Sequence, residues 1–223
     1  MNNILAAILA GAQLMQLTAP ETVTPMVDTI ESSAKRGVNL LRQLLMFARG
    51  ADHDMHPVQV GGVLAEVAAV VRETFGREYE VVLAADAAVP AITADPNQLH
   101  QILMNLCVNA RDAMPDGGRL EISARVRSLT KDDAARLGTE ARAGDYAVVA
   151  VRDNGAGMTA AVKARLFDPF FTTKPVGKGT GLGLATVLRL VRRHGGFVRV
   201  ESAPGEGALF ECHLPISAAS SAQ

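Results

Sequence analysis

Cysteine is scarce in this sequence, which argues against a disulfide-stabilised or zinc-binding protein. Its 223 residues include only Cys107 and Cys212, and the two do not have the spacing of metal ligands. Both lie among apolar residues, so we expect two small buried side chains in a reducing compartment. A disulfide between them is the less favoured alternative.

The sequence also lacks an excess of charge of either sign and a long apolar run. The formal net charge is −1, which gives no argument for nucleic-acid binding. The apolar run near the start, Ile4–Ala12, is too short to cross a bilayer and has no preceding basic segment like that of a signal peptide. We expect no direct membrane contact and a cytoplasmic location, either alone or as the cytoplasmic part of a membrane-linked receptor.

Residues 1–50 are expected to form a helical hairpin. Apolar residues recur at helical spacing from Leu5 to Met15 and again from Val27 to Ala48, and two prolines lie between these stretches. A two-helix hairpin buries only one seam, so we expect two copies to pair in a four-helix bundle and form a homodimer. The alternative is that the hairpin packs on the rest of the chain.

The remainder of the chain alternates strand and helix patterns. We place a polar linker at residues 51–57, an α/β domain at residues 58–215 and a tail at residues 216–223. The first strand of this domain is expected at Val58–Val60 and its first helix at Gly62–Phe75. The predicted fold class is therefore α+β, with a helical hairpin followed by an α/β domain.

The strongest helix signal begins at Asp95 and extends to about Met114. Asp95 is an N-cap carboxylate, Pro96 occupies the first helical position, and Gln98 is placed to complete a capping box. Leucines at positions 99, 103 and 106 form the apolar stripe of this helix.

A second stripe on the same helix is polar and contains Asn105, Asn109 and Asp112. Asparagine is a poor helix former, so two on one face indicate a function. Amide oxygens are suitable ligands for a Mg²⁺ ion that already carries nucleotide phosphates and water. The alternative is a solvated polar face.

Two glycine-containing motifs follow. An apolar strand ends in DNGAGM, residues 153–158, where Asp153 can accept a hydrogen bond from an adenine amine and the glycines allow close approach to a flat ligand. Further on, Gly177, Gly179, Gly181 and Gly183 alternate just before an amphipathic helix. Backbone N–H groups that such a glycine loop exposes beside a helix N-terminus can bind a phosphate. The alternative is that this stretch is a flexible surface loop without a ligand.

Together and in this order, the motifs resemble the catalytic and ATP-binding domain of sensor histidine kinases over roughly residues 55–215. QILMNLCVNARDA resembles the N box of that family, DNGAGM its first glycine box, LFDPFFTTK its F box and GKGTGLGL its second glycine box. GEGALF is similar to a weaker final glycine signature. The resemblance implies an α/β sandwich of the histidine kinase, gyrase and heat-shock chaperone ATPase type, with helices layered on a mixed sheet.

The resemblance also implies roles for individual residues. ATP is expected between the asparagine helix and a mobile lid, residues 167–180, whose root is anchored by Phe167, Phe170 and Phe171. Asn109 is expected to hold Mg²⁺ through the ATP phosphates. The residues implied in nucleotide binding are Asn105, Asn109, Arg111, Asp112, Asp153, Gly155, Gly157, Met158, Phe170, Thr173, Lys174, Gly177, Lys178, Gly179, Thr180, Gly181, Leu182 and Gly183.

The hairpin resembles the dimerisation and phosphotransfer module of the same family, but without its phospho-acceptor. The family's histidine and its acidic neighbour are expected just before Met1, and none of the five histidines lies in the first helix. The implied reaction transfers the ATP γ-phosphate to a histidine absent from this chain and then to an aspartate of a response regulator receiver domain. The chain as written is not expected to autophosphorylate in the usual way.

Two alternatives to the kinase are a non-phosphorylating regulatory module that dimerises through the hairpin and a gyrase-type ATPase. In the ATPases that the chain resembles in fold, a glutamate one helical turn before the Mg²⁺-binding asparagine orients and deprotonates water. Here that position is Asn105, which is not a base, so the rate of water attack is lower by a factor of roughly 10²–10⁴. This residue therefore favours the kinase over the ATPase.

Overall fold

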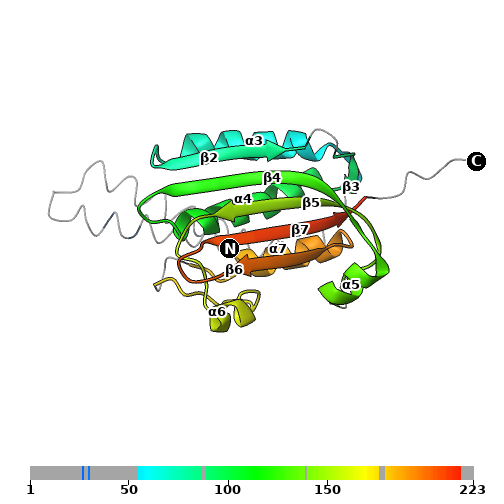
Figure 1. Ribbon diagram of the computed structural model, residues 1–223. Coiled ribbons are helices and arrows are strands. Elements are labelled where there is room, and N and C mark those ends of the chain that lie inside the picture. Colours follow the sequence, from blue (N-terminus) through cyan, green and yellow to red (C-terminus); the bar gives the residue numbers. More distant parts are fainter. Residues whose placement is uncertain are drawn as a thin grey trace, which may run out of the picture. The chain divides into compact units, whose positions relative to one another are not determined.

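The computed structural model describes residues 27, 30, 55–86, 89–138, 140–175 and 179–216. The chain divides into two compact units, residues 1–52 and 53–223. The expected hairpin and its dimer interface lie outside the described residues, apart from Val27 and Ile30, which are both helical. The second unit contains the motifs singled out above and is drawn in colour in Figure 1.

A five-stranded mixed sheet forms the centre of this unit, with strand order β2-β4-β5-β7-β6. β2 runs parallel to β4, and the other neighbouring pairs are antiparallel. A separate two-stranded antiparallel sheet joins β1 and β3. The strands are β1 (His56–Val58), β2 (Tyr79–Ala85), β3 (Ile92–Ala94), β4 (Gly118–Leu129), β5 (Gly144–Asp153), β6 (Phe197–Ser202) and β7 (Ala208–Pro215).

Three helices cover one face of the sheet and enclose the main core (Figure 1). They are α3 (Val60–Thr74), α4 (Pro96–Asp112) and α7 (Gly183–Arg193). Both cysteines are buried in this core and unpaired, and burial raises the pKa of each thiol to about 12. The layered α/β sandwich with a mixed sheet confirms the expected fold. Within the described ranges, no helix is long and apolar enough to cross a membrane.

Two short helices lie at opposite ends of the sheet. α5 (Lys131–Leu137) follows β4 and has a capping box between Thr130 and Asp133. A second small apolar cluster, which includes Leu129, Tyr146 and Phe197, lies near it. At the other end, α6 (Ala160–Arg165) precedes the lid (Figure 1).

The start of this unit differs from the expectation. The first strand is His56–Val58, not Val58–Val60, so two residues of the expected linker belong to a strand. Pro57 is compatible with this strand because, among the described residues, β1 pairs with β3 alone and its other edge has no neighbouring strand. The first helix begins at Val60 rather than Gly62, since Val60 is fully buried and extends the apolar face of α3.

The N-terminus of α4 is capped as predicted by Asp95, but the capping box is not formed. Asp95 Oδ1 accepts from the N–H groups of Asn97 and Gln98 at 2.9 and 3.3 Å. The Gln98 side chain donates through Nε2 to the Asp95 carboxylate at 2.8 Å and does not accept from the Asp95 N–H, as a capping box requires. The Asp95 N–H is not available for that bond, because it donates to Nε2 of the buried His194 at 3.2 Å. The start of α4 is thereby joined to the end of α7.

Candidate functional site

The polar stripe of α4 faces the N-terminus of α7. Asn105 and Asn109 are half-buried, and a Cβ placed on Gly183 would lie 3.7 Å from Asn105 Oδ1 and from Asn109 Nδ2. Gly183 is the first residue of α7, so the end of the glycine loop lies against the asparagine stripe. The first N–H groups of a helix have no partner within the helix, so this helix start is a favourable environment for an anion.

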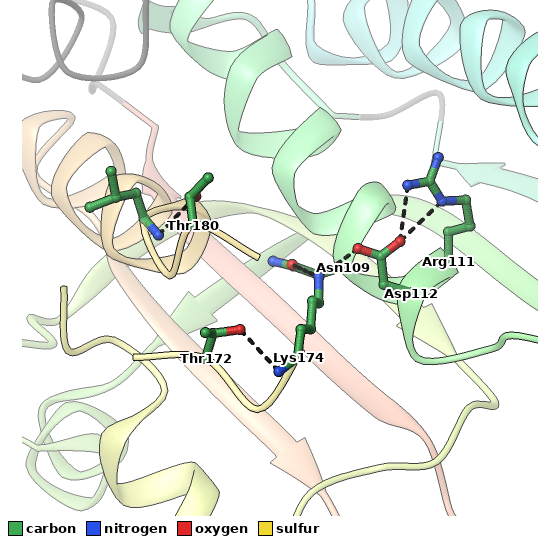
Figure 2. A network of polar contacts seen from close by, with 7 residues as sticks. Asn109, Arg111, Asp112, Thr172, Lys174 and Thr180 are labelled. Atoms are coloured by element: carbon green, nitrogen blue, oxygen red, sulfur yellow. Dashed lines mark hydrogen bonds and ion pairs between the residues drawn. The ribbon is translucent and has the colours of Figure 1, made fainter. Parts of the chain in front are cut away.

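A lysine from the lid reaches the same stripe. Lys174 Nζ lies 2.5 Å from Asp112 Oδ2 and 3.4 Å from Asn109 Oδ1 (Figure 2). Burial of Asp112 favours its neutral form, but the hydrogen bonds and charges of Lys174 and Arg111 outweigh burial and lower the pKa of this carboxyl. Asp112 is therefore a carboxylate at neutral pH, and it holds the lysine beside Asn109.

Arg111 lies on the other side of Asp112 from Lys174 (Figure 2). Its Nη2 and Nε donate to Asp112 Oδ1 at 2.9 and 3.2 Å, and its guanidinium lies over the Phe75 ring, 5.1 Å from the centroid. The structure thus brings Arg111 to Asp112 and Phe75, and not to the start of α7.

The two ends of the lid are joined at its root. The Phe170 N–H donates to Gly181 O at 3.0 Å, and both residues have positive φ, +68° and +65°. The Phe171 ring carries the Arg165 guanidinium 4.4 Å from its centroid, and Phe167 packs against the main core. The Phe170 ring is 68% exposed, so this residue anchors the root through its backbone and not, as expected, through its aromatic ring.

Between these ends the lid folds on itself. Thr172 Oγ1 accepts from the Lys174 N–H at 3.1 Å, and a Cβ on Gly179 would lie only 2.6 Å from that Thr172 oxygen. Thr180 Oγ1 accepts from the N–H of the buried Leu182 at 3.3 Å. Thr173 is exposed. Two expected ligands, Gly177 and Lys178, lie outside the described residues.

Asp153 ends β5 and is almost fully buried, as the sequence predicted. Its Oδ1 accepts from the N–H groups of Gly155 at 2.9 Å and Ala208 at 3.2 Å. Burial raises the pKa of this carboxyl, and the two N–H donors offset only part of that increase. Since both bonds engage Oδ1, Oδ2 is left as an acceptor for the donor group of a ligand.

The glycines after Asp153 have a role that the sequence did not indicate. A Cβ on Gly155 would lie 2.5 Å from the Ala113 carbonyl oxygen, at the end of α4. A Cβ on Gly157, whose φ is +64°, would lie 1.9 Å from the Ala203 carbonyl oxygen. The close approach at both glycines is therefore to backbone of the chain itself. Met158, next in the motif, is held by a bond from its N–H to Ser202 Oγ at 2.9 Å.

A cavity of about 580 Å³ opens between the end of α4 and the lid. Its lining includes Asp112 and Lys174, together with Tyr79, Pro115 and Pro175, which the motifs did not indicate. Tyr79 is positioned by a hydrogen bond from its hydroxyl to Met114 O at 3.0 Å. In the described part of the chain, no three His, Cys, Asp or Glu side chains group in a way that could hold a metal ion alone. A cation here would need oxygen ligands from a bound molecule.

Comparison with protein families gives a match that covers more than half of the chain. Residues 94–218 match the family described as histidine kinase-, DNA gyrase B- and HSP90-like ATPase. This range includes α4, Asp153, the lid and α7.

Individual relatives are sensor kinases. The chain is 37% identical over 217 residues to the sensor kinase CckA of Brucella abortus, covering 96% of this chain and 23% of that protein. It is 32% identical over 217 residues to the sensory histidine kinase/phosphatase NtrB of Rhodobacter capsulatus, covering 96% of this chain and 59% of that protein. The chain therefore spans about a quarter of the length of one relative and less than two thirds of the other.

A solved structure with a similar fold is that of full-length ShkA in complex with AMPPNP. The TM-score is 0.75 at 27% sequence identity, and the match covers 96% of this chain and 43% of that one. The bound molecule in that complex is a non-hydrolysable ATP analogue.

Proposed function

Since this chain belongs to the family of histidine kinase-, DNA gyrase B- and HSP90-like ATPases, we propose that it is the ATP-binding kinase core of a sensor histidine kinase. The observation that carries the proposal is the convergence of three elements far apart in sequence. Asn109 and Asp112 of α4, Lys174 of the lid and the N-terminus of α7 meet at one place.

The proposed orientation of ATP follows from the chemistry at the two ends of the site. The start of α7 and Lys174 supply N–H donors and positive charge for the triphosphate. Asp153 supplies a buried acceptor for the adenine amine. A nucleotide between these ends passes along α4, with the lid folded over its phosphates.

The residues present fit a magnesium ion. The Lys174 ammonium already lies at a point where an amide oxygen of Asn109 and a carboxylate oxygen of Asp112 converge. Oxygen ligands of this kind suit Mg²⁺, with the remaining positions taken by phosphate oxygens and water. When bound, the ion supplies charge neutralisation of the triphosphate, and Asn109 is the residue proposed to hold it.

The side chains favour phosphoryl transfer over hydrolysis. In the structure Asn105 occupies the position facing the α7 start, and an amide there cannot deprotonate water. Phosphoryl transfer needs mainly alignment and charge neutralisation, which Lys174 and the backbone N–H groups supply. The proposed acceptor is a histidine outside this chain, and the final acceptor an aspartate of a response regulator receiver domain.

The proposal extends to assembly and location. Residues 1–50 are proposed to form the hairpin that pairs two copies. With β1 included, the proposed linker is residues 51–55 and the catalytic domain residues 56–215, followed by a tail at residues 216–223. The protein acts in the cytoplasm, alone or as part of a larger receptor. A non-phosphorylating regulatory module with the same fold is the second candidate, and the experiment below separates the two.

The test restores a His-Asp pair in helical sequence just before Met1 and supplies ATP labelled at the γ-phosphate. The kinase proposal predicts a labelled protein whose phosphate is released by acid. Two controls, a Gln in place of the added histidine and Asn109→Ala in the chain, should both abolish labelling. A protein that binds nucleotide but never labels supports the regulatory module, and steady release of phosphate without labelling supports an ATPase.

A further inference from the structure

We propose that Asp112 is a positioning residue that makes this site bind nucleotide together with a divalent cation in preference to nucleotide alone. The inference rests on the proposed function and adds to it a residue that determines which form of the nucleotide is bound. It starts from the place that Lys174 occupies.

The Lys174 ammonium fills a position suited to a metal cation. It contacts Asp112 Oδ2 at 2.5 Å and Asn109 Oδ1 at 3.4 Å, so two oxygens from successive turns of α4 meet at one positive charge (Figure 2). Both side chains are partly shielded from water, with 30% of Lys174 and 24% of Asp112 exposed. Two oxygens held in this way define a binding point for any cation of suitable size.

The orientation of Asp112 is fixed independently of Lys174. Arg111 binds the other carboxylate oxygen, Oδ1, through both Nη2 and Nε, and the guanidinium is held in turn over the Phe75 ring. Oδ2 therefore continues to point toward Asn109 when the lysine leaves. The guanidinium of Arg111 also remains as a positive charge beside this carboxylate when the lysine leaves.

Nucleotide binding forces an exchange at this point. A triphosphate at the start of α7 attracts the Lys174 ammonium, which then no longer neutralises Asp112. Nucleotide alone would leave a carboxylate beside the phosphates, and like charges at such distances in a half-buried site weaken binding. Asn109 and Asp112 would hold a divalent cation in the place that the lysine leaves, and its charge would offset that of the carboxylate. The Asp112 carboxylate therefore weakens the binding of free nucleotide and strengthens the binding of its cation complex.

The test compares nucleotide affinity with and without the cation in the whole chain. The dissociation constant of AMPPNP is measured by calorimetry in excess Mg²⁺ and again in EDTA. The coupling ratio is the constant in EDTA divided by the constant in Mg²⁺, and it expresses how strongly the cation favours nucleotide binding. Asp112→Asn keeps the size of the side chain and removes its charge. Asp116→Asn, in the exposed turn after α4, removes the same charge away from the lysine and serves as the control.

We expect Asp112→Asn to bind AMPPNP about tenfold more tightly in EDTA and to lower the coupling ratio by about tenfold or more. Asp116→Asn should leave the ratio unchanged. An unchanged coupling ratio in Asp112→Asn overturns the inference, whether or not both affinities weaken equally. That result identifies Asp112 as a structural partner of the lid alone. If the unaltered chain binds no nucleotide in either condition, the proposed function itself fails, and the inference fails with it.

Discussion

Gly181, directly after the lid, has no room for an added methyl group. It adopts φ +65°, and a Cβ there would lie 2.3 Å from the Phe170 carbonyl carbon and 2.6 Å from its oxygen. The atoms that it meets are backbone, so no side-chain rotation relieves the contact. Gly181→Ala should therefore separate the two ends of the lid.

The size of the effect follows from two terms. An alanine in the left-handed region costs about 1–2 kcal/mol, and the lost hydrogen bond from Phe170 N–H to Gly181 O costs about 1 kcal/mol. If the lid must close for nucleotide to bind, roughly 2–3 kcal/mol corresponds to a roughly 30- to 150-fold higher Kd. The core should be little affected, because an open lid relieves the strain locally.

The assay is displacement of a fluorescent ATP analogue, with thermal unfolding measured in parallel. Gly205→Ala is the matched control, because Gly205 also has positive φ, +78°, but its Cβ would have no atom of another described residue within 4 Å, its two chain neighbours aside. The control should lose about 1–2 kcal/mol of stability and keep its nucleotide affinity. The reasoning is refuted if Gly181→Ala binds nucleotide as tightly as the control does.

Three further predictions concern the framework of the site. Asp95→Ala should lower the free energy of unfolding by about 1–2 kcal/mol, measured in urea, because it removes the cap of α4, while nucleotide affinity stays unchanged. Gly207→Ala should destabilise by about 2 kcal/mol or more beyond Gly205→Ala, since its Cβ would lie 2.0 Å from Asp153 O; equal melting temperatures would contradict this. Because burial raises the pKa of Asp153 above 3.8, its contribution to stability is largest below that pH and declines as pH rises through the folded pKa. Asp153→Asn should remove this decline from the pH profile of unfolding and weaken ATP binding about tenfold.

The elements that the sequence predicted best are those whose signals are local. α4 combines an N-cap, a proline at its first position and an apolar stripe, and the structure has it from Pro96 to Asp112, two residues short of the expected end at Met114. β3 and α6 went unpredicted because each is short, and short elements depend on tertiary pairing more than on their own sequence.

Contacts across long sequence separations were not predictable. Nothing local to Asp112 indicates that its partner is Lys174, 62 positions away. Nothing near Asp95 indicates that His194 accepts its N–H and so leaves Gln98 without the expected acceptor role. The motifs identified which residues belong to the site, and the arrangement of charges among them required the fold.

The most direct test of the account is the calorimetric binding of AMPPNP in excess Mg²⁺ to the whole chain and to its Asn109→Ala variant. The account predicts one nucleotide per chain, displaced by ADP and not by GDP, and a loss of most of this affinity in Asn109→Ala while the Asp116→Asn control retains it. Absence of binding by the unaltered chain, or equal affinity in Asn109→Ala, would contradict the assignment of this site to ATP.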